Sequence, residues 1–304
     1  MTRTQSLGST MFLLLAALAL AACGDDGSPA TGTPDAGTPD AGTNPLVQAR
    51  PYMLNVPSSY DKSKPTPLVL LLHGYSANPY VQVRIFGLLD GSEKHGYLVA
   101  YPDGMTDSSG KQFWNATDGC CNIDNSPVDD VAYLSAVIDD VEARYNIDPK
   151  RVYVMGHSNG GYMAHRLACD IGGRIAAIVS LAGMTWLDPS KCPAAAPVNV
   201  LQVHGDADDT VLYTGSSRYP SAPVTVATWA AKNHCSGALA DGGAPIDLVS
   251  DLVGAETTLQ SYAGCPAAGA VDFWTIHGGG HIPMLVPSDW EEVMWAWLVA
   301  HPKP

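Results

Sequence analysis

The chain has 304 residues, of which 46% are hydrophobic, and this is enough to fill the core of one large α/β domain. Its 16 Lys and Arg against 30 Asp and Glu give a formal net charge of −14, which repels phosphate backbones, so no nucleic acid partner is expected. The low charged fraction, 15%, suits an exported protein.

The first 22 residues predict a secretory signal, in which Arg3 precedes a short apolar run over 11–20. That run is too short to span a bilayer comfortably. Residues 20–23, Leu-Ala-Ala-Cys, resemble a bacterial lipobox, which implies cleavage before Cys23 and diacylation of its thiol. Gly24 beside the cysteine is similar to the pattern of outer-membrane lipoproteins. We expect an exported, lipid-anchored protein of the cell envelope, with a plain secretory signal as the alternative.

Residues 23–45 consist mainly of Gly, Ser, Thr, Pro, Asp and Ala and contain the repeat Gly-Thr-Pro-Asp-Ala at 32–36 and 37–41. No apolar face exists here, so the segment is expected to be an extended tether. The folded domain is expected over 46–304.

The rest of the chain alternates apolar runs with helical patterns, which predicts a mostly parallel sheet covered by helices on both faces. The runs predict strands over 52–56, 67–72, 97–101, 151–155, 176–181, 198–203, 258–262 and 271–276. Helices are predicted over 131–145, 161–169, 224–233 and 289–300. Trp290, Met294 and Trp297 share one face of the last helix, which favours core packing over a carbohydrate-binding stripe.

The pentapeptide Gly156-His157-Ser158-Asn159-Gly160 follows the strand predicted at 151–155 and precedes a predicted helix. A serine hydroxyl is a poor nucleophile at neutral pH and needs a sharp strand-to-helix turn that lifts Oγ toward an imidazole. The motif therefore predicts a nucleophile elbow with Ser158 as the nucleophile.

A base and an acid should follow such a serine, each just past the end of a strand. The strand ending at 203 leads into a loop with Asp206, Asp208 and Asp209, and Asp208 is our choice for the acid. The other two carboxylates are expected to stabilise the loop.

His281 ends the glycine loop 278–280, which can bring its imidazole over Ser158, so we predict that it is the base. His277 lies at the strand end and is expected to be structural. A metal site using both histidines would need a helix that three consecutive glycines disfavour, and no metal is expected.

Acyl transfer also needs N–H donors aimed at the developing oxyanion. The strand 67–72 leads into His73-Gly74-Tyr75, where glycine would let the backbone turn. We predict the Tyr75 N–H and the Asn159 N–H as the two donors.

These pieces together resemble the polyhydroxybutyrate depolymerase and feruloyl esterase relatives, α/β-hydrolases of carbohydrate esterase family 1 type. The resemblance covers nearly everything from Tyr52 onward and implies the triad Ser158, Asp208 and His281 with Tyr75 and Asn159 at the oxyanion positions. It rests on the segments 67–74, 101–104, 113–116, Cys120-Cys121, 128–131, 156–161, 204–208 and 279–281. Two departures are Asp206, where the family often has Thr, and Ile282, where it often has Trp.

Trp114 lies in a long loop and is expected to line the cleft, with anchoring of the loop as the alternative. Tyr213 and Ile282 are further candidates for substrate binding. Asp129 and Asp130 most simply cap the helix that follows them.

Six cysteines remain after Cys23, an even number that predicts disulfides in an exported chain. Cys235 and Cys265 are expected to pair. Cys120 and Cys121 are each expected to seek a distant partner among the remaining cysteines, Cys169 and Cys192, with the pairing left open.

The sequence thus predicts a serine carboxylesterase without a cofactor, acting on small or polymeric esters. The resemblance favours feruloyl or acetyl esters of plant polysaccharide, with polyhydroxybutyrate or its oligomers as the alternative. A catalytically inactive binding module is a remote third possibility. Oligomeric state is left open.

Overall fold

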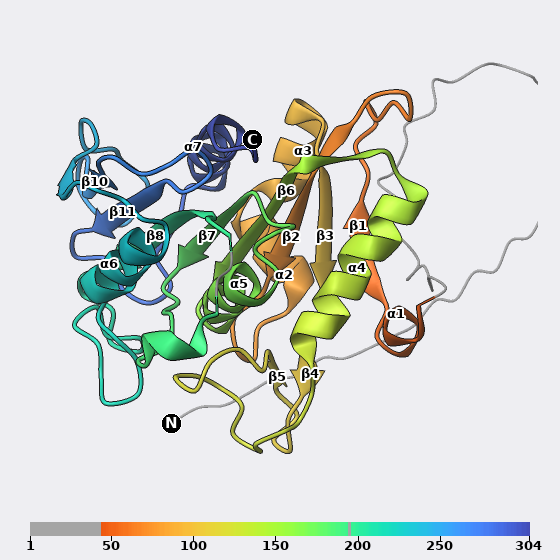
Figure 1. Ribbon diagram of the computed structural model, residues 1–304, viewed down its shortest axis with the longest axis horizontal. Helices are drawn as coiled ribbons and strands as arrows, with labels where there is room; N and C mark the ends of the chain where they lie inside the picture. The colour runs from red at the N-terminus through yellow and green to blue at the C-terminus, as the bar shows by residue number, and fades with distance from the viewer. Residues whose placement is uncertain (1–43, 194–195) are drawn as a thin grey trace, which may run out of the picture. The chain divides into compact units, whose positions relative to one another are not determined.

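The computed structural model describes residues 44–193 and 196–304, so the predicted signal, Cys23 and nearly all of the tether lie outside the described residues. The described chain forms a sheet in the order β1-β3-β2-β6-β7-β8-β11-β10-β9 (Figure 1). Its strands are β1 (Tyr52–Asn55), β2 (Thr66–Leu72), β3 (Leu98–Pro102), β6 (Ile147–His157), β7 (Ala177–Leu181), β8 (Asn199–Gly205), β9 (Leu239–Asp241), β10 (Thr257–Tyr262) and β11 (Val271–Ile276). The strands from β3 to β11 in that order are parallel, whereas β1, β10 and β9 join antiparallel at the edges.

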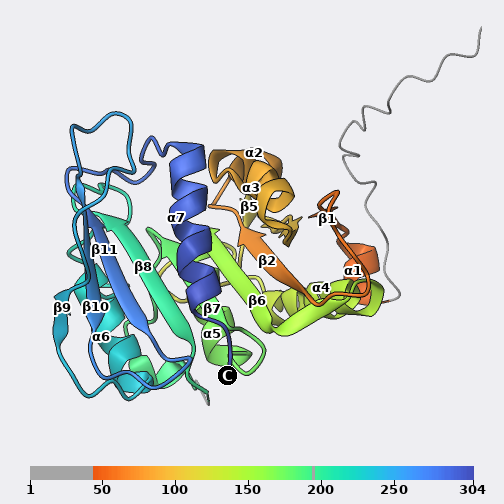
Figure 2. The same cartoon turned by 90° about the horizontal axis from the view of Figure 1, so that it is seen from above.

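Helices cover both faces of the sheet, as predicted, and Figure 2 shows the two layers from above. The helices are α1 (Pro45–Ala49), α2 (Pro79–Ile85), α3 (Leu88–His95), α4 (Asp130–Arg144), α5 (Asn159–Asp170), α6 (Ala222–Lys232) and α7 (Pro287–Ala300). Helices α4, α5 and α6 enclose one core, and α2, α3 and α7 enclose the other. Alternate strand residues enter opposite cores, as Leu70 and Leu71 do, because side chains of a strand point to opposite faces. Among the described residues no helix is long and apolar enough to cross a membrane.

All eight predicted strands and all four predicted helices are present within a few residues of their expected bounds. Trp290, Met294 and Trp297 are buried in the core, as predicted. Helices α1, α2 and α3 are not among the predicted elements, because they are short; Gly87, at φ 68°, separates α2 from α3 and interrupts any longer apolar period. Strand β9 and the small ribbon of β4 (Met105–Thr106) and β5 (Gln112–Phe113) are likewise not among them.

Three disulfides join the described cysteines. The pair Cys235–Cys265 forms as expected. The expectation of distant partners for Cys120 and Cys121 is wrong, because these neighbours bond to each other. Cys169, at the end of α5, is instead bridged to Cys192 with 5.1 Å between their Cα atoms, which leaves no third cysteine for either.

A buried polar network lies beneath α5. The indole of Trp229 donates to Nδ1 of His165 at 2.9 Å, so Nε2 carries the proton and donates to Gln202 at 2.9 Å. Gln202 in turn donates to the Gly183 carbonyl and to His204. Burial lowers the pKa of His165 to about 4 and keeps the imidazole neutral.

Stability should fall in mild acid because of His165. In the unfolded chain the His165 imidazole is protonated below about pH 6.5, whereas in the folded protein it stays neutral down to about pH 4. The free energy of unfolding therefore decreases as pH falls from 6.5 to 4. His165→Gln has no imidazole to protonate, so the slope of its free energy of unfolding against pH should be smaller by the equivalent of up to one proton. Denaturant unfolding at a series of pH values measures both slopes, and identical slopes would contradict the assignment.

Candidate active site

Ser158 occupies a strained turn between β6 and α5. Its φ is 53° and its ψ is −120°, a region that non-glycine residues avoid unless the surrounding structure imposes it. Its side chain makes no capping hydrogen bond to α5, which leaves Oγ available. Two glycines permit the turn: a Cβ at Gly156 would lie 2.2 Å from the Gly160 carbonyl oxygen, and one at Gly160 would lie 2.0 Å from that of Leu72.

Gly160→Ala is therefore expected to destabilise the protein by about 3 kcal/mol, because the added methyl group meets backbone that cannot rotate away. Gly173→Ala is the matched control, since nothing lies within 4 Å of a Cβ there. Denaturant unfolding of both variants checks the difference. Equal stability of the two would contradict this account of the elbow.

Three side chains from three strand ends form one hydrogen-bonded chain. Nε2 of His281 lies 2.9 Å from Ser158 Oγ, and its Nδ1 lies 2.8 Å from Oδ2 of Asp208. Ser158 and Asp208 are 7% and 5% exposed, so the chain is largely shielded from water. The structure thus brings together the three residues predicted as nucleophile, base and acid.

Asp208 is surrounded by donors. Its Oδ1 accepts the backbone N–H groups of Thr210 and Val211, each at 2.9 Å, and its Oδ2 also lies 3.2 Å from Nε2 of His204. Burial alone would raise the pKa of Asp208, but the hydrogen bonds from His204, His281 and the Thr210 N–H outweigh it and hold the pKa well below its usual range. The carboxylate is therefore ionised at neutral pH.

The other acids of this loop have local partners. Asp206 accepts from His277 Nδ1 at 2.8 Å and from the Gly278 N–H at 2.7 Å. Asp209 accepts from the Thr210 hydroxyl. Both the loop-stabilising role of these carboxylates and the structural role of His277 agree with the sequence prediction.

His157, the residue before the nucleophile, holds the backbone of the predicted base. Its Nε2 donates to the His281 carbonyl oxygen at 2.8 Å, and the two rings lie 5.1 Å apart. Burial, with the neighbouring His281, lowers the pKa of His157 to about 4, so it stays a neutral donor. No local sequence pattern indicates this role, because the contact joins positions 124 residues apart.

The turn after β2 lies against the elbow. A Cβ at Gly74 would lie 3.4 Å from the Ser158 Cβ, and the Tyr75 N–H has no hydrogen-bond partner among the described residues. Buried His73 accepts the Gly104 N–H and donates to the Gly74 carbonyl, each at 2.8 Å, which secures this turn. Asn159 opens α5, so its N–H lacks an intrahelical partner.

A cavity of about 180 Å³ opens beside Ser158. Its walls come from α2, a helix that no sequence pattern predicts, and from the segment after His281. Ile282, 69% exposed, lines it as expected. The full lining is mostly apolar: Gly74, Tyr75, Ala77, Asn78, Val81, Gln82, Ile85, Phe86, His157, Ser158, Leu181, His281, Ile282, Pro283 and Leu285.

Residues 67–221 match the family model described as the alpha/beta hydrolase fold. The chain belongs to the α/β hydrolase fold family. It is 27% identical over 244 residues to feruloyl esterase B of Piromyces equi, covering 76% of this chain and 42% of that protein. It is 33% identical over 148 residues to the bifunctional acetylxylan esterase/xylanase of Neocallimastix patriciarum, covering 49% of this chain and 20% of that protein.

The chain spans less than half the length of these curated relatives. Among solved structures, an acetyl xylan esterase from Aspergillus awamori superposes with a TM-score of 0.60 at 15% identity, over 86% of this chain and 98% of that one. The likeness in structure supports the α/β-hydrolase fold.

Two aromatic residues expected in the substrate cleft of this α/β-hydrolase are absent from the lining of the cavity beside Ser158. Trp114 is fully buried, and its indole donates a hydrogen bond to the His73 carbonyl oxygen. The Asn159 side chain accepts the backbone N–H of Trp114 and donates to the backbone carbonyl oxygen of Trp114. Trp114 therefore anchors its loop, which is the alternative that the sequence left open, and does not line the cleft. Tyr213 stacks on Phe273 and forms a hydrogen bond with Thr275, and it is not among the residues that line the cavity of Ser158.

Asp129 caps α4 by accepting the Ala132 N–H, as expected, but Asp130 does not act as a cap. Its buried carboxylate pairs with Arg50 at 2.7 Å and accepts the Asn115 N–H at 2.7 Å. Asp130 thereby ties the loop after Trp114 to the start of the α/β-hydrolase domain.

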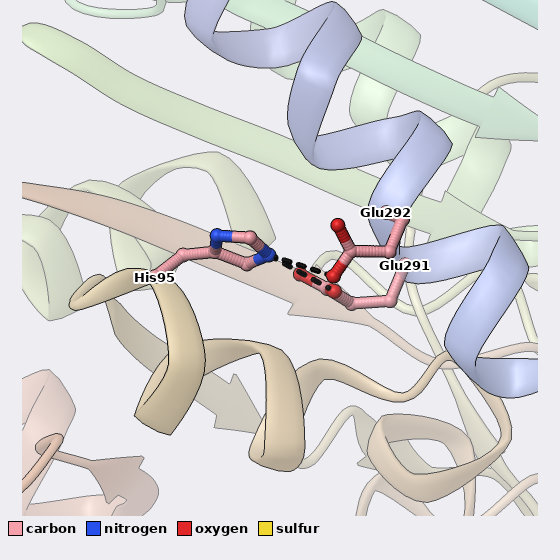
Figure 3. A group of neighbouring side chains, drawn as sticks. All are labelled: His95, Glu291 and Glu292. Carbon is pink, nitrogen blue, oxygen red and sulfur yellow. Dashed lines mark hydrogen bonds and ion pairs between the residues drawn. The ribbon is translucent and has the colours of Figure 1, made fainter.

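A further group of titratable side chains joins α3 to α7 outside the cavity of this α/β-hydrolase (Figure 3). Nε2 of His95 lies 2.9 Å from Glu292 and 3.5 Å from Glu291, and the potential ligand atoms lie within 4.8 Å of one another. The Lys94 ammonium already pairs with the same Glu292 oxygen, and the Tyr97 hydroxyl donates to Glu291. A bound metal would have to displace that lysine, so we assign the group to the packing of α3 on α7.

Proposed function

We propose that the protein is a serine carboxylesterase that works through an acyl-enzyme. The observation that carries this proposal is the buried chain from Ser158 through His281 to Asp208, with the serine on a strained turn. A hydroxyl within hydrogen-bond reach of an imidazole that a carboxylate orients is the arrangement that activates a nucleophile.

In this mechanism His281 takes the proton of Ser158 as Oγ attacks the ester carbonyl carbon. Ionised Asp208 stabilises the imidazolium that results, and the N–H groups of Tyr75 and Asn159 receive the developing oxyanion. His281 then returns the proton to the departing alcohol. Water, deprotonated by the same imidazole, releases the acid from the acyl-enzyme.

Feruloyl or acetyl esters of plant polysaccharide are the proposed substrates. The names of the two curated relatives and of the solved acetyl xylan esterase support this class. The apolar cavity beside Ser158, which exposed Ile282 helps to line, offers a site for the acyl group. Hydroxybutyrate polyesters are the second candidate, because an apolar cavity of this size also admits a short aliphatic acyl group.

We also propose that the protein is exported and anchored by lipid at Cys23. Three disulfides join the six cysteines of the described domain, and such bridges persist in oxidising compartments. Metabolic labelling with a fatty acid, compared between the native chain and Cys23→Ala, tests the anchor. Unlabelled native protein would reject it.

Hydrolysis of p-nitrophenyl acetate, methyl ferulate, acetylated xylan and hydroxybutyrate oligomers, compared by kcat/KM, tests the proposed activity and substrate class. We expect all turnover to stop after treatment with a fluorophosphonate, and mass spectrometry should locate the adduct on Ser158. If none of the four esters is hydrolysed, the esterase proposal is rejected and a binding module is favoured.

A further inference from the structure

The loop that follows β5 borders a second cavity, of about 580 Å³, within the size range of sites that hold small ligands. It shares no lining residue with the cavity of Ser158. Its walls are polar and include Asn115, Cys120, Cys121, Arg166, Lys191 and Arg218.

The second cavity is connected to the nucleophile turn through α5. Arg166 donates hydrogen bonds to the carbonyl oxygens of Asn115 and Ala116. The side chain of Asn159 forms two hydrogen bonds with the backbone of Trp114, the residue before them. Arg166 follows Asn159 by seven positions, or about 10 Å along the helix. These contacts tie one wall of the second cavity to the helix that begins beside Ser158.

The disulfide between Cys120 and Cys121 is unusual because it joins adjacent residues. It spans neighbouring residues, so it closes no long loop and cannot stabilise the fold in the way that long-range bridges do. Cys121 has φ 88°, a backbone conformation that non-glycine residues adopt uncommonly. Both bridged cysteines line the cavity, and their sulfur atoms are polarisable.

The charges of the second cavity are unequal. Arg166 pairs with Asp170, and Lys191 pairs with Asp118. Arg218 is exposed and makes no ion pair with any described residue. The unpaired Arg218 guanidinium is free to form a charge-assisted hydrogen bond with a carboxylate of a ligand.

We propose that the second cavity binds a uronic acid residue of the polysaccharide that carries the ester. The sugar ring packs on the Cys120–Cys121 bridge, and its carboxylate pairs with Arg218. The proposal rests on the proposed function, because it supplies the polymer with a second point of attachment beyond Ser158. It gives the protein a preference for acidic over neutral chains.

Calorimetric titration with unesterified oligosaccharides tests the proposal without any turnover. The probes are a xylo-oligosaccharide bearing one glucuronic acid and the unsubstituted chain of equal length. Arg218→Gln should bind the acidic probe about tenfold more weakly, the loss of a charge-assisted hydrogen bond, and the neutral probe as native protein does. Lys150→Gln removes an exposed charge outside the cavity and should match native protein with both probes.

The double variant Cys120→Ser/Cys121→Ser should bind both probes more weakly while its thermal unfolding stays near native, because no long loop is released. No binding by native protein, equal affinity for both probes, or native affinity in Arg218→Gln would overturn the proposal. If the acidic probe binds but no ester is hydrolysed, the esterase proposal fails while the cavity assignment stands.

Discussion

Replacing Ser158 by alanine is expected to lower kcat/KM for p-nitrophenyl acetate by about 10⁴-fold or more. The variant keeps His281, Asp208 and both backbone donors, so what is lost is the oxygen that forms the acyl-enzyme. Binding and the oxyanion donors alone would leave a small residual rate.

Thermal unfolding provides the control for Ser158→Ala. The serine hydroxyl makes no bond to α5, so the elbow should persist and the unfolding temperature should stay close to native. A variant that folds normally and retains native turnover would reject the nucleophile and the whole mechanism. Loss of turnover with a normal fold is the expected result.

Replacing Asp208 by asparagine is expected to lower kcat by about 10⁴-fold. The amide has no charge to stabilise an imidazolium, and if its NH₂ group faces His281, Nδ1 must become an acceptor, which puts the proton on Nε2. That tautomer cannot accept the Ser158 proton. Steady-state kinetics with p-nitrophenyl acetate measures the loss.

Asp206→Asn is the matched control, because Asp206 lies in the same loop and also bonds to a histidine, but that histidine is the exposed His277. We expect its kcat to stay within about threefold of native, in line with a surface ion pair of low energy. Equal losses in the two variants would contradict the choice of Asp208 as the acid. A loss confined to Asp206→Asn would reverse the assignment.

Local signals account for what could be predicted. The strands of the central sheet are continuous apolar runs because helices cover both faces of the sheet. Such runs can be recognised in the sequence without knowing which strands pair. The elbow was readable too, since Gly156 and Gly160 are required by a turn that involves only a few consecutive residues. The positions of Asp208 and His281 followed from parallel strands, whose carboxyl ends meet at one edge of the sheet.

Contacts between distant segments could not be predicted in the same way. Trp114 looked available because it lies outside any periodic element, yet His73 and Asn159, 41 and 45 residues away, bury it. Cys120 and Cys121 pair with each other, whereas Cys169 finds its partner in Cys192, 23 residues further along the chain. Asp130 does not cap α4 because its carboxylate pairs with Arg50, 80 residues away in the chain.

The sequence by itself determined the covered parallel sheet, the elbow at Ser158 and the three residues that now form one hydrogen-bonded chain, because each depends on period, turn chemistry or strand order. Only the tertiary structure decided which side chains face substrate. The walls beside Ser158 come from α2 and Ile282, and the second cavity from the Cys120–Cys121 loop with Arg218. Cavity shape depends on how loops far apart in the chain pack together, and no local pattern encodes that packing.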